Sequence, residues 1–153
     1  MKTSILFINI MLLAIFTYGQ DINIDYDSTL AAQLGADDYG MKSYVLVILK
    51  TGNNDIQDKP TLDSLFAGHF ENINRMTEEG KLSVAGPIAN NDYSYRGIFI
   101  LDVSTFEEAL EQLAADPTIK QNIFDVELFK WYGSAALPTY LETHKKIQKH
   151  KIK

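Results

Sequence analysis

Apolar residues along the chain change between two spacings, and the changes divide it into elements. In Lys42–Lys50 both alternating sets of residues are apolar and rich in β-branched or aromatic side chains, which predicts a strand buried on both faces. From Pro60 to Gly80 apolar residues follow helical spacing, which predicts an amphipathic helix with proline in its first turn and glycine as its stop. Strands are predicted again at Lys81–Ala85 and Tyr95–Val103.

The second half of this region repeats the helix-then-strand pattern. Ser104 and Glu107 have the spacing of a capping box, so a second helix is predicted to begin there. The Asp116-Pro117 step is predicted to end it, because the residue before proline avoids helical geometry. Ile123–Trp131 alternates as a fourth strand. The order is therefore β-α-β-β-α-β, which is an α+β, ferredoxin-like plan.

One face of the predicted sheet has no helix to cover it. Both helices of this plan lie on the same face, yet the first strand is apolar on both of its faces. A second copy packed sheet against sheet, giving a dimeric α+β barrel, is the simplest cover. The alternative is an N- or C-terminal extension docked on this face. Trp131 suits either the core or a dimer interface.

The two ends of the chain differ from the domain in composition. Lys2 precedes an apolar run broken only by Asn9, so residues 1–19 are predicted to be a signal peptide, cleaved near Gly19–Gln20, and the protein to be exported. The alternative is an N-terminal core helix. Residues 20–41 are an acidic segment, predicted to hold a short helix and to dock loosely on the domain.

The domain is assigned to residues 42–132, and residues 133–153 to a basic C-terminal helix or tail beginning near Pro138. The last ten residues contain five lysines. We favour a solvated helix whose lysines suit its C-terminal dipole over contact with an anionic membrane or glycan surface.

Composition excludes several classes of function. The chain has no cysteine, which rules out disulfides and a thiol nucleophile. Residues 20–143 hold 8 basic residues against 20 acidic ones, which argues against nucleic-acid binding. No metal site is predicted, because His144 and His150 are six residues apart and do not share a helix face. No phosphate-binding glycine loop is present, and no cofactor is expected.

His69 is the one histidine outside the C-terminal tail. It follows Leu65 by four residues and precedes Ile73 by four, so it lies on the apolar face of the first helix. A histidine oriented by a carboxylate can remove a proton next to a carbonyl, or serve lactone and enol isomerisation. The alternative is a core histidine bonded to a backbone carbonyl.

Several short motifs follow one another in residues 42–132. They are His69, the run Gly80-Lys81-Leu82-Ser83-Val84-Ala85-Gly86-Pro87, then Tyr95-Arg96-Gly97, Ser104 with Glu107-Glu108-Ala109, Asp116-Pro117, and Glu127 with Trp131. In this order and spacing they resemble the YciI-like (YCII-related) family. The resemblance implies a small dimeric α+β barrel, akin in fold to muconolactone isomerase, with a His–Asp site in the cleft beside the sheet.

By this resemblance His69 corresponds to the family's helix histidine and Asp116 to the aspartate of its Asp-Pro step, while Asp92 resembles an acidic position in the loop after Gly86-Pro87. Arg96, at the start of a strand, can hold a substrate carboxylate or form a salt bridge with a nearby acid. Tyr93 and Tyr95 line a pocket mouth or pack the loop.

Two hypotheses of different class follow from the sequence. The first is an exported enzyme of isomerase or lyase type, with His69 as general base, Asp116 or Asp92 as its orienting group and Arg96 as an anion clamp. The second is a non-catalytic homodimer that binds a small molecule or has a structural role. In neither case does the sequence name the ligand.

Overall fold

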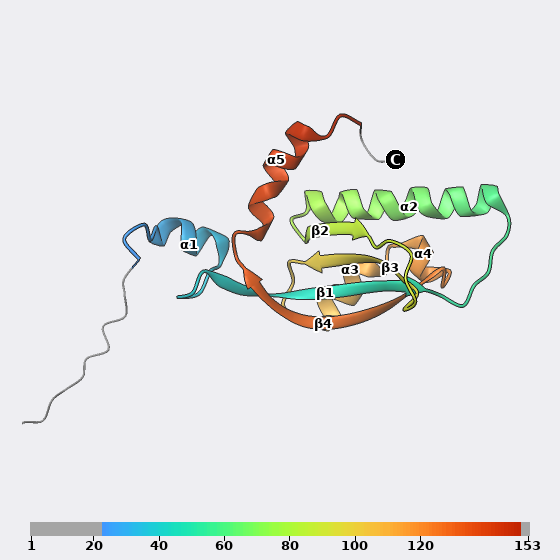
Figure 1. Ribbon diagram of the computed structural model, residues 1–153, viewed down its shortest axis with the longest axis horizontal. Coiled ribbons are helices and arrows are strands. Elements are labelled where there is room, and N and C mark those ends of the chain that lie inside the picture. The colour runs from blue at the N-terminus through green and yellow to red at the C-terminus, as the bar shows by residue number, and fades with distance from the viewer. Residues whose placement is uncertain (1–22, 151–153) are drawn as a thin grey trace, which may run out of the picture.

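The computed structural model describes residues 23–150, so the predicted signal peptide lies outside the described residues. The chain forms a four-stranded sheet, and Figure 1 shows helices packed against this sheet and a helical extension at each end of the described chain. The elements are α1 (Ser28–Leu34), β1 (Met41–Thr51), α2 (Lys59–Glu78), β2 (Leu82–Pro87), β3 (Tyr95–Leu101), α3 (Phe106–Leu113), α4 (Pro117–Lys120), β4 (Phe124–Ser134), a 3-10 turn η1 (Leu137–Thr139) and α5 (Tyr140–Ile147).

The sheet has the strand order β2-β3-β1-β4, and every neighbouring pair is antiparallel. The long strand β1 lies inside the sheet, and it pairs with β4 from Met41 opposite Ser134 to Thr51 opposite Phe124. The predicted β-α-β-β-α-β order is confirmed, with α4 as a short additional helix before the last strand. The fold is thus an α+β, ferredoxin-like arrangement.

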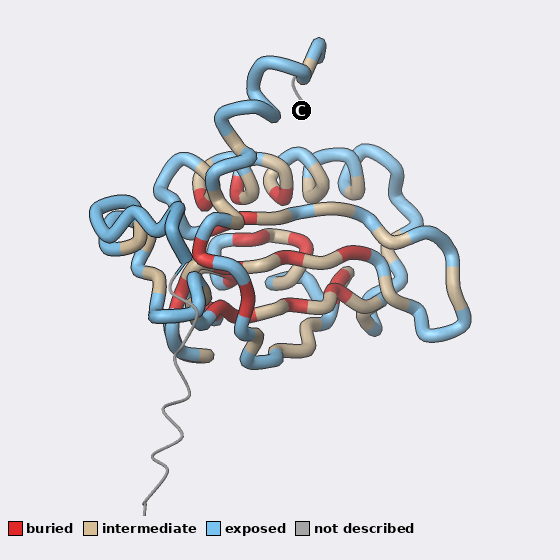
Figure 2. Tube along the Cα trace, turned by 60° about the vertical axis from the view of Figure 1, so that its left-hand side comes forward, coloured by how far each residue is buried: buried red, intermediate tan, exposed pale blue. Residues whose placement is uncertain are grey.

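The hydrophobic core lies between one face of the sheet and three helices. Alternate residues of β1 and β3 point into it, and α2, α3 and α4 supply its other side. The buried residues are Val45, Val47, Leu49, Met76, Leu82, Phe99, Leu101, Val103, Ala109, Leu113 and Phe124. Figure 2 shows this distribution as buried positions gathered on the strands and on the inner side of α2. Both predicted helices therefore cover the same face.

The other sheet face is apolar but only partly buried. At its centre Leu46 lies opposite Ile100 and Ile48 opposite Ile98, and all four side chains keep intermediate exposure. Phe129, beside Leu46 on β4, is 48% exposed. We call this surface, formed by Leu46, Ile48, Ile98, Ile100 and Phe129, the open face.

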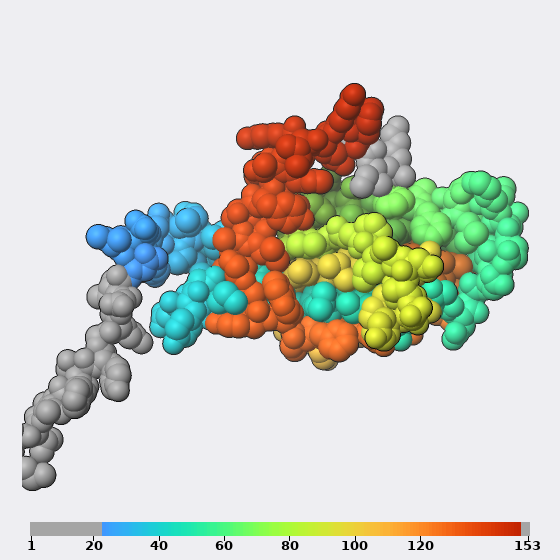
Figure 3. Space-filling model, in the orientation of Figure 1, coloured from blue at the N-terminus to red at the C-terminus, as the bar shows by residue number. Residues whose placement is uncertain are grey.

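The helical extensions α1 and α5 are mostly exposed to solvent. Neither α1 nor α5 contains a buried residue, and Figure 3 shows both standing out from the body of the molecule. Asp37 holds the N-terminal segment to β4 by accepting a hydrogen bond from the Tyr132 hydroxyl. Among residues 23–150 there is no helix with both the length and the apolar character needed to cross a membrane.

The predicted start of the second helix was wrong by one residue. Thr105, rather than Ser104, is the N-cap: its Oγ1 accepts from the Glu108 amide at 3.1 Å, and Glu108 Oε2 accepts from the Thr105 amide at 3.2 Å. The sequence contains two overlapping capping boxes. The later one is used, and the helix that follows it places Ala109 and Leu113 in the core.

The predicted role of Asp116-Pro117 also needs correction. The helix α3 already ends at Leu113, and Asp116-Pro117 starts the next helix, α4, with Asp116 as its N-cap and Pro117 in its first turn. Proline suits that place because the first amide of a helix has no intrahelical partner. This short helix fixes the position of the Asp116 side chain.

Candidate functional site

The helix α2 places His69 on its inner side. Its buried residues His69, Asn72 and Met76 follow one another at spacings of three and four, which puts them on one face. Asp58 caps the helix by accepting from the Thr61 amide at 2.9 Å. His69 is 6% exposed. Its inward orientation is therefore fixed by the helix and not by a flexible loop.

Asp116 meets His69 from the start of α4. Its Oδ2 lies 2.6 Å from His69 Nδ1, and its side chain is fully buried. Its Oδ1 accepts two further hydrogen bonds from Thr118, from the amide at 2.9 Å and from the hydroxyl at 2.6 Å. We call His69 and Asp116 the dyad. The contact is with a carboxylate, and not with the backbone carbonyl considered as the alternative for His69.

Gly68 allows α4 to approach α2 closely enough for this contact. A Cβ atom at Gly68 would lie 2.6 Å from Cγ of Pro117, well inside van der Waals contact. Glycine in the middle of a helix is unfavourable by about 1 kcal/mol relative to alanine, so its presence requires a packing reason. The close packing of Pro117 provides that reason.

The charge state of Asp116 results from opposing effects. Burial raises the pKa of its carboxyl, but the hydrogen bonds from His69 and Thr118 and the charge of His69 outweigh burial, so the pKa is lowered overall. Asp116 is therefore an anion at neutral pH. An ionised carboxylate only accepts hydrogen bonds, so Nδ1 of His69 carries a proton. In the neutral ring this leaves the lone pair on Nε2.

Aromatic rings surround the imidazole of His69. The ring of Phe99 stacks on it with centroids 5.9 Å apart, and the Phe66, Phe70 and Phe124 rings meet it edge-on, with centroids 5.5 to 6.4 Å away. In residues 23–150 the fully buried side-chain polar atom without a partner is Ser83 Oγ. Nε2 of His69 makes no hydrogen bond with the described residues, and unlike Ser83 Oγ it is not fully buried.

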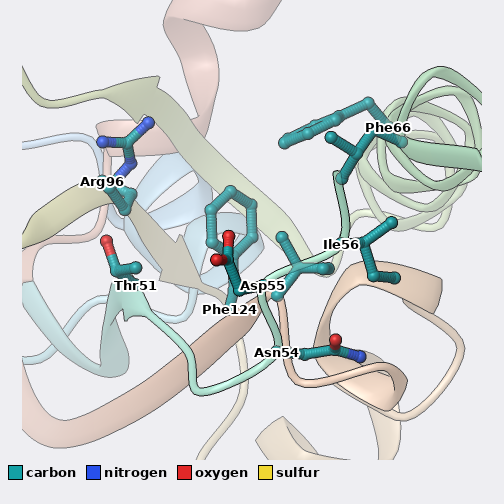
Figure 4. A pocket seen from close by; sticks show the side chains of 9 residues that line it. Thr51, Asn54, Asp55, Ile56, Phe66, Arg96 and Phe124 are labelled. Carbon is teal, nitrogen blue, oxygen red and sulfur yellow. The ribbon is translucent and has the colours of Figure 1, made fainter. Parts of the chain in front are cut away.

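A pocket of about 220 Å³ lies on the other side of two of these rings. It is lined by Thr51, Asn54, Asp55, Ile56, Leu62, Phe66, Arg96, Ile123 and Phe124. Figure 4 shows Arg96 and Thr51 on one side of it, Phe66 and Ile56 on the other, and Asp55 and Phe124 between them. Because Phe66 and Phe124 contact both the pocket and His69, one layer of aromatic side chains separates the pocket from the dyad.

Arg96 reaches the pocket through an irregularity in the sheet. The pairing of β1 with β3 shifts between Leu49 and Lys50: Leu49 lies opposite Gly97 and Lys50 opposite Tyr95, so Arg96 is an extra residue. Such a bulge redirects a side chain. Within the described chain the Arg96 side chain forms neither a hydrogen bond nor an ion pair, so the salt bridge considered as an alternative is not seen.

The other predicted site residues lie apart from the dyad. Asp92 is exposed in the loop before β3 and makes no hydrogen bond or ion pair with any described residue, so Asp116 and not Asp92 meets His69. The Tyr93 and Tyr95 rings stack on each other with centroids 5.6 Å apart, and neither lines the pocket. Among residues 23–150 no group of three or more His, Asp or Glu side chains is placed to hold a metal ion.

Sequence reasoning did not find Thr118, Gly68, Asp55 or the two phenylalanines at the pocket. Gly68 carried a signal, since a glycine inside a helical pattern calls for a reason. Phe66 carried no such signal, because an aromatic residue on an apolar helix face cannot be distinguished from an ordinary core residue. Asp55 gave none either, because one acidic residue in a polar loop is indistinguishable from a solvated one.

Comparison with known families gives one match. The model of the YCII-related domain matches residues 44–132, which contain the whole dyad, the pocket and nearly all of the sheet. The match leaves out α1 and α5. No curated protein matches the chain.

Proposed function

Because this chain belongs to the YCII-related domain family, we propose that it is a small-molecule enzyme of isomerase or lyase type, with the dyad as its acid–base catalyst. The observation that carries the proposal is the 2.6 Å contact between Nδ1 of His69 and the buried Asp116 carboxylate, one aromatic layer from a pocket. This contact fixes the tautomer of the ring and leaves Nε2 as the proton acceptor.

In the proposed reaction Nε2 removes a proton from a carbon atom next to a carbonyl group. The electron pair of the broken C–H bond moves into the new bond to the carbonyl carbon, and the carbonyl oxygen becomes negative. The imidazolium that forms is stabilised by Asp116 and returns the proton to the same or another carbon. This is proton transfer without a nucleophile, which fits a site whose chain has no cysteine.

Arg96 is proposed to hold an anionic group of the substrate. Its guanidinium lines the pocket without a partner among the described residues, and a guanidinium binds a carboxylate through two parallel hydrogen bonds. The pocket, at about 220 Å³, is smaller than the roughly 300–1,000 Å³ of sites for drug-sized ligands. The proposed substrate is therefore a small metabolite.

The side chains of Phe66 and Phe124 control access from the pocket to His69 in this proposal. Their rings lie between the pocket and the imidazole, so a substrate must displace one of them to reach Nε2. Rotation of an aromatic side chain at a pocket wall is a local motion that requires no change of fold.

A non-catalytic ligand-binding protein is the second candidate. The observation that favours it is that His69 does not itself line the pocket and is only 6% exposed. In that case the dyad only holds α4 against α2, and the pocket binds its ligand without changing it.

A homodimer is part of both proposals. The open face supports it, because Leu46, Ile48, Ile98 and Ile100 form a continuous, partly exposed apolar surface on the middle strands. A second copy packed sheet against sheet would cover it. Light scattering coupled to size-exclusion chromatography is expected to give twice the chain mass, and a monomer at micromolar concentration would contradict the dimer.

Hydrogen exchange at carbon tests the catalytic proposal without knowledge of the net reaction. The protein is incubated in D₂O with a mixture of small oxo acids, lactones and carboxylic acids, and mass spectrometry records which compounds gain deuterium. His69→Gln is expected to slow the exchange by at least about a hundredfold. His144→Gln, at an exposed histidine on α5, is the matched control and is expected to change nothing.

Equal exchange in wild type and His69→Gln would contradict the assignment of His69. If the wild-type protein exchanges no compound although its pocket binds one of them, the non-catalytic alternative is the correct one. Circular dichroism of His69→Gln is needed beside the exchange data, since an unfolded variant would also be inactive.

A further inference from the structure

The pocket holds two opposite charges that do not pair with each other. Arg96 and Asp55 both line it, and no ion pair joins them. From this arrangement we propose that the pocket binds a zwitterion of the α-amino-acid class, with its carboxylate on Arg96, its ammonium group on Asp55 and an apolar side chain on Phe66 and Phe124.

The partners of the two charged side chains support this assignment. Asp55 accepts a hydrogen bond from the Gln57 side-chain amide, and among the described residues it has no cationic partner. Some other exposed charges of the domain are paired, as in Lys59 with Asp63 and Arg75 with Glu79, whereas Asp92 has no partner among the described residues. Arg96 and Asp55 are thus a cation and an anion left unpaired on the same concave surface.

The charge of the whole protein favours a neutral ligand over an anion. The chain has a formal net charge of -6, and residues 20–143 hold 20 acidic residues against 8 basic ones. The field of such a protein repels phosphate esters and dicarboxylates on approach. A zwitterion has no net charge, so it avoids this repulsion and still offers a carboxylate to Arg96.

The rest of the lining suits the apolar part of the ligand. Ile56, Leu62, Phe66, Ile123 and Phe124 provide the remaining apolar walls. A volume of about 220 Å³ corresponds to roughly seven water molecules at about 30 Å³ each. That space is large enough for an amino acid with a branched or aromatic side chain.

The inference rests on the proposed function in placing the ligand in the same pocket, and it adds which part of the ligand faces His69. With the two charges of the ligand held by Arg96 and Asp55, the side chain of the amino acid lies over Phe66 and Phe124, the rings that cover the imidazole. The side chain of the ligand therefore faces the imidazole, and the proposed proton transfer requires a carbonyl group in that side chain.

Three ligands with the same branched hydrocarbon group test the inference by NMR titration of the ¹⁵N-labelled protein. L-leucine carries both charges, 4-methylpentanoate lacks the ammonium group, and 3-methylbutylamine lacks the carboxylate. The wild type is expected to bind L-leucine about tenfold more tightly than either analogue, the effect of one charge-assisted contact at a partly exposed site.

Two variants assign the contacts. Asp55→Asn is expected to remove the preference for L-leucine over 4-methylpentanoate and to keep the preference over 3-methylbutylamine, whereas Arg96→Gln does the reverse. Both side chains are exposed, so both variants are expected to fold. The inference is overturned if the wild type binds 4-methylpentanoate as tightly as L-leucine, if it binds none of the three, or if neither variant alters the preference.

The same titration separates this inference from the proposed function. His69→Gln is expected to bind L-leucine as the wild type does, because His69 does not line the pocket. Selective binding of L-leucine, with no compound of the exchange mixture gaining deuterium, would support the zwitterion site and contradict the enzyme. Exchange of other carboxylic acids without leucine binding would support the enzyme and contradict the zwitterion site.

Discussion

Two pairs of titratable side chains lie on either side of the Phe66 and Phe124 rings, and they differ in burial and in pairing. His69 and Asp116 are buried, 2.6 Å apart and further bonded to Thr118. Arg96 and Asp55 are exposed and do not pair. A buried charge without a partner is costly, whereas an exposed one is solvated. Arg96 and Asp55 can therefore remain unpaired until a ligand binds, whereas His69 and Asp116 cannot.

This difference separates the tasks of the site. The dyad is held in one geometry by two helices, which suits a group that must present one nitrogen in a fixed tautomer. The Arg96 and Asp55 side chains gain their counter-charges only when a ligand enters. Substitutions are therefore expected to affect stability on one side of the rings and binding on the other.

The largest effect on stability is expected from Asp116→Ala. It leaves the His69 Nδ1–H and the Thr118 amide without their acceptor and removes the N-cap of α4. Breaking a buried pair in this way costs about 3–5 kcal/mol of unfolding free energy. Urea denaturation measures it, and Asp92→Ala, at an exposed acid without partners, is expected to change stability by less than about 0.5 kcal/mol. Equal midpoints would contradict the structural role of the dyad.

A smaller loss is expected from Gly68→Ala. The new Cβ lies 2.6 Å from Pro117 Cγ, so α4 must move away from α2. Overpacking of this kind costs about 1–3 kcal/mol, against a gain of about 1 kcal/mol in helix propensity. Gly86→Ala is the control, because an added Cβ there meets nothing within 4 Å. A stabilised Gly68→Ala variant would show that the approach of Pro117 is loose.

A smaller effect is expected from pH, because the stability of the folded protein depends on the ionisation of Asp116. Its pKa is lowered in the folded protein, so it contributes stability that is fully present above the unfolded value and is lost as pH falls through the folded one. The wild type should therefore lose stability below about pH 4. In Asp116→Asn this part of the acid destabilisation is expected to disappear. Parallel stability curves for the two proteins would assign the loss to other carboxylates.

The smallest effect on stability is expected from Arg96→Gln. The side chain is exposed and has no partner among the described residues, so unfolding free energy should change by less than about 0.5 kcal/mol. A thermal or urea unfolding curve that overlays the wild type would agree with a side chain kept for binding. A loss above 1 kcal/mol would instead indicate a structural contact.

Much of the fold followed from the sequence because its signals are local. The apolar period of β1 and α2 predicted both elements, and helical spacing placed His69 on the inner side of α2 before any contact was known. The register of α3 was not decided locally, since Ser104 and Thr105 offer equivalent capping boxes. The helix that forms uses the Thr105 box and buries Ala109 and Leu113.

The site itself depended on contacts far apart in the chain. Asp116 and His69 are 47 residues apart, and their meeting depends on Gly68 and on the turn of α4, which periodicity does not reveal. The resemblance to a family pointed to this partner, and its motifs also pointed to Asp92, which lies elsewhere. Arg96 faces the pocket because of a bulge, against the simple alternation of its strand.

The central claim is that Asp116 keeps a proton on Nδ1 of His69 and leaves Nε2 free to accept another. NMR of ¹⁵N-histidine-labelled protein measures both nitrogens directly, with pH raised until the ring is neutral and with His69→Gln used to assign the signals. We predict a neutral ring that is protonated on Nδ1 and unprotonated on Nε2. In Asp116→Asn we expect the equilibrium between the two neutral tautomers of the ring to shift. A neutral ring that carries its proton on Nε2 would contradict the dyad as a base.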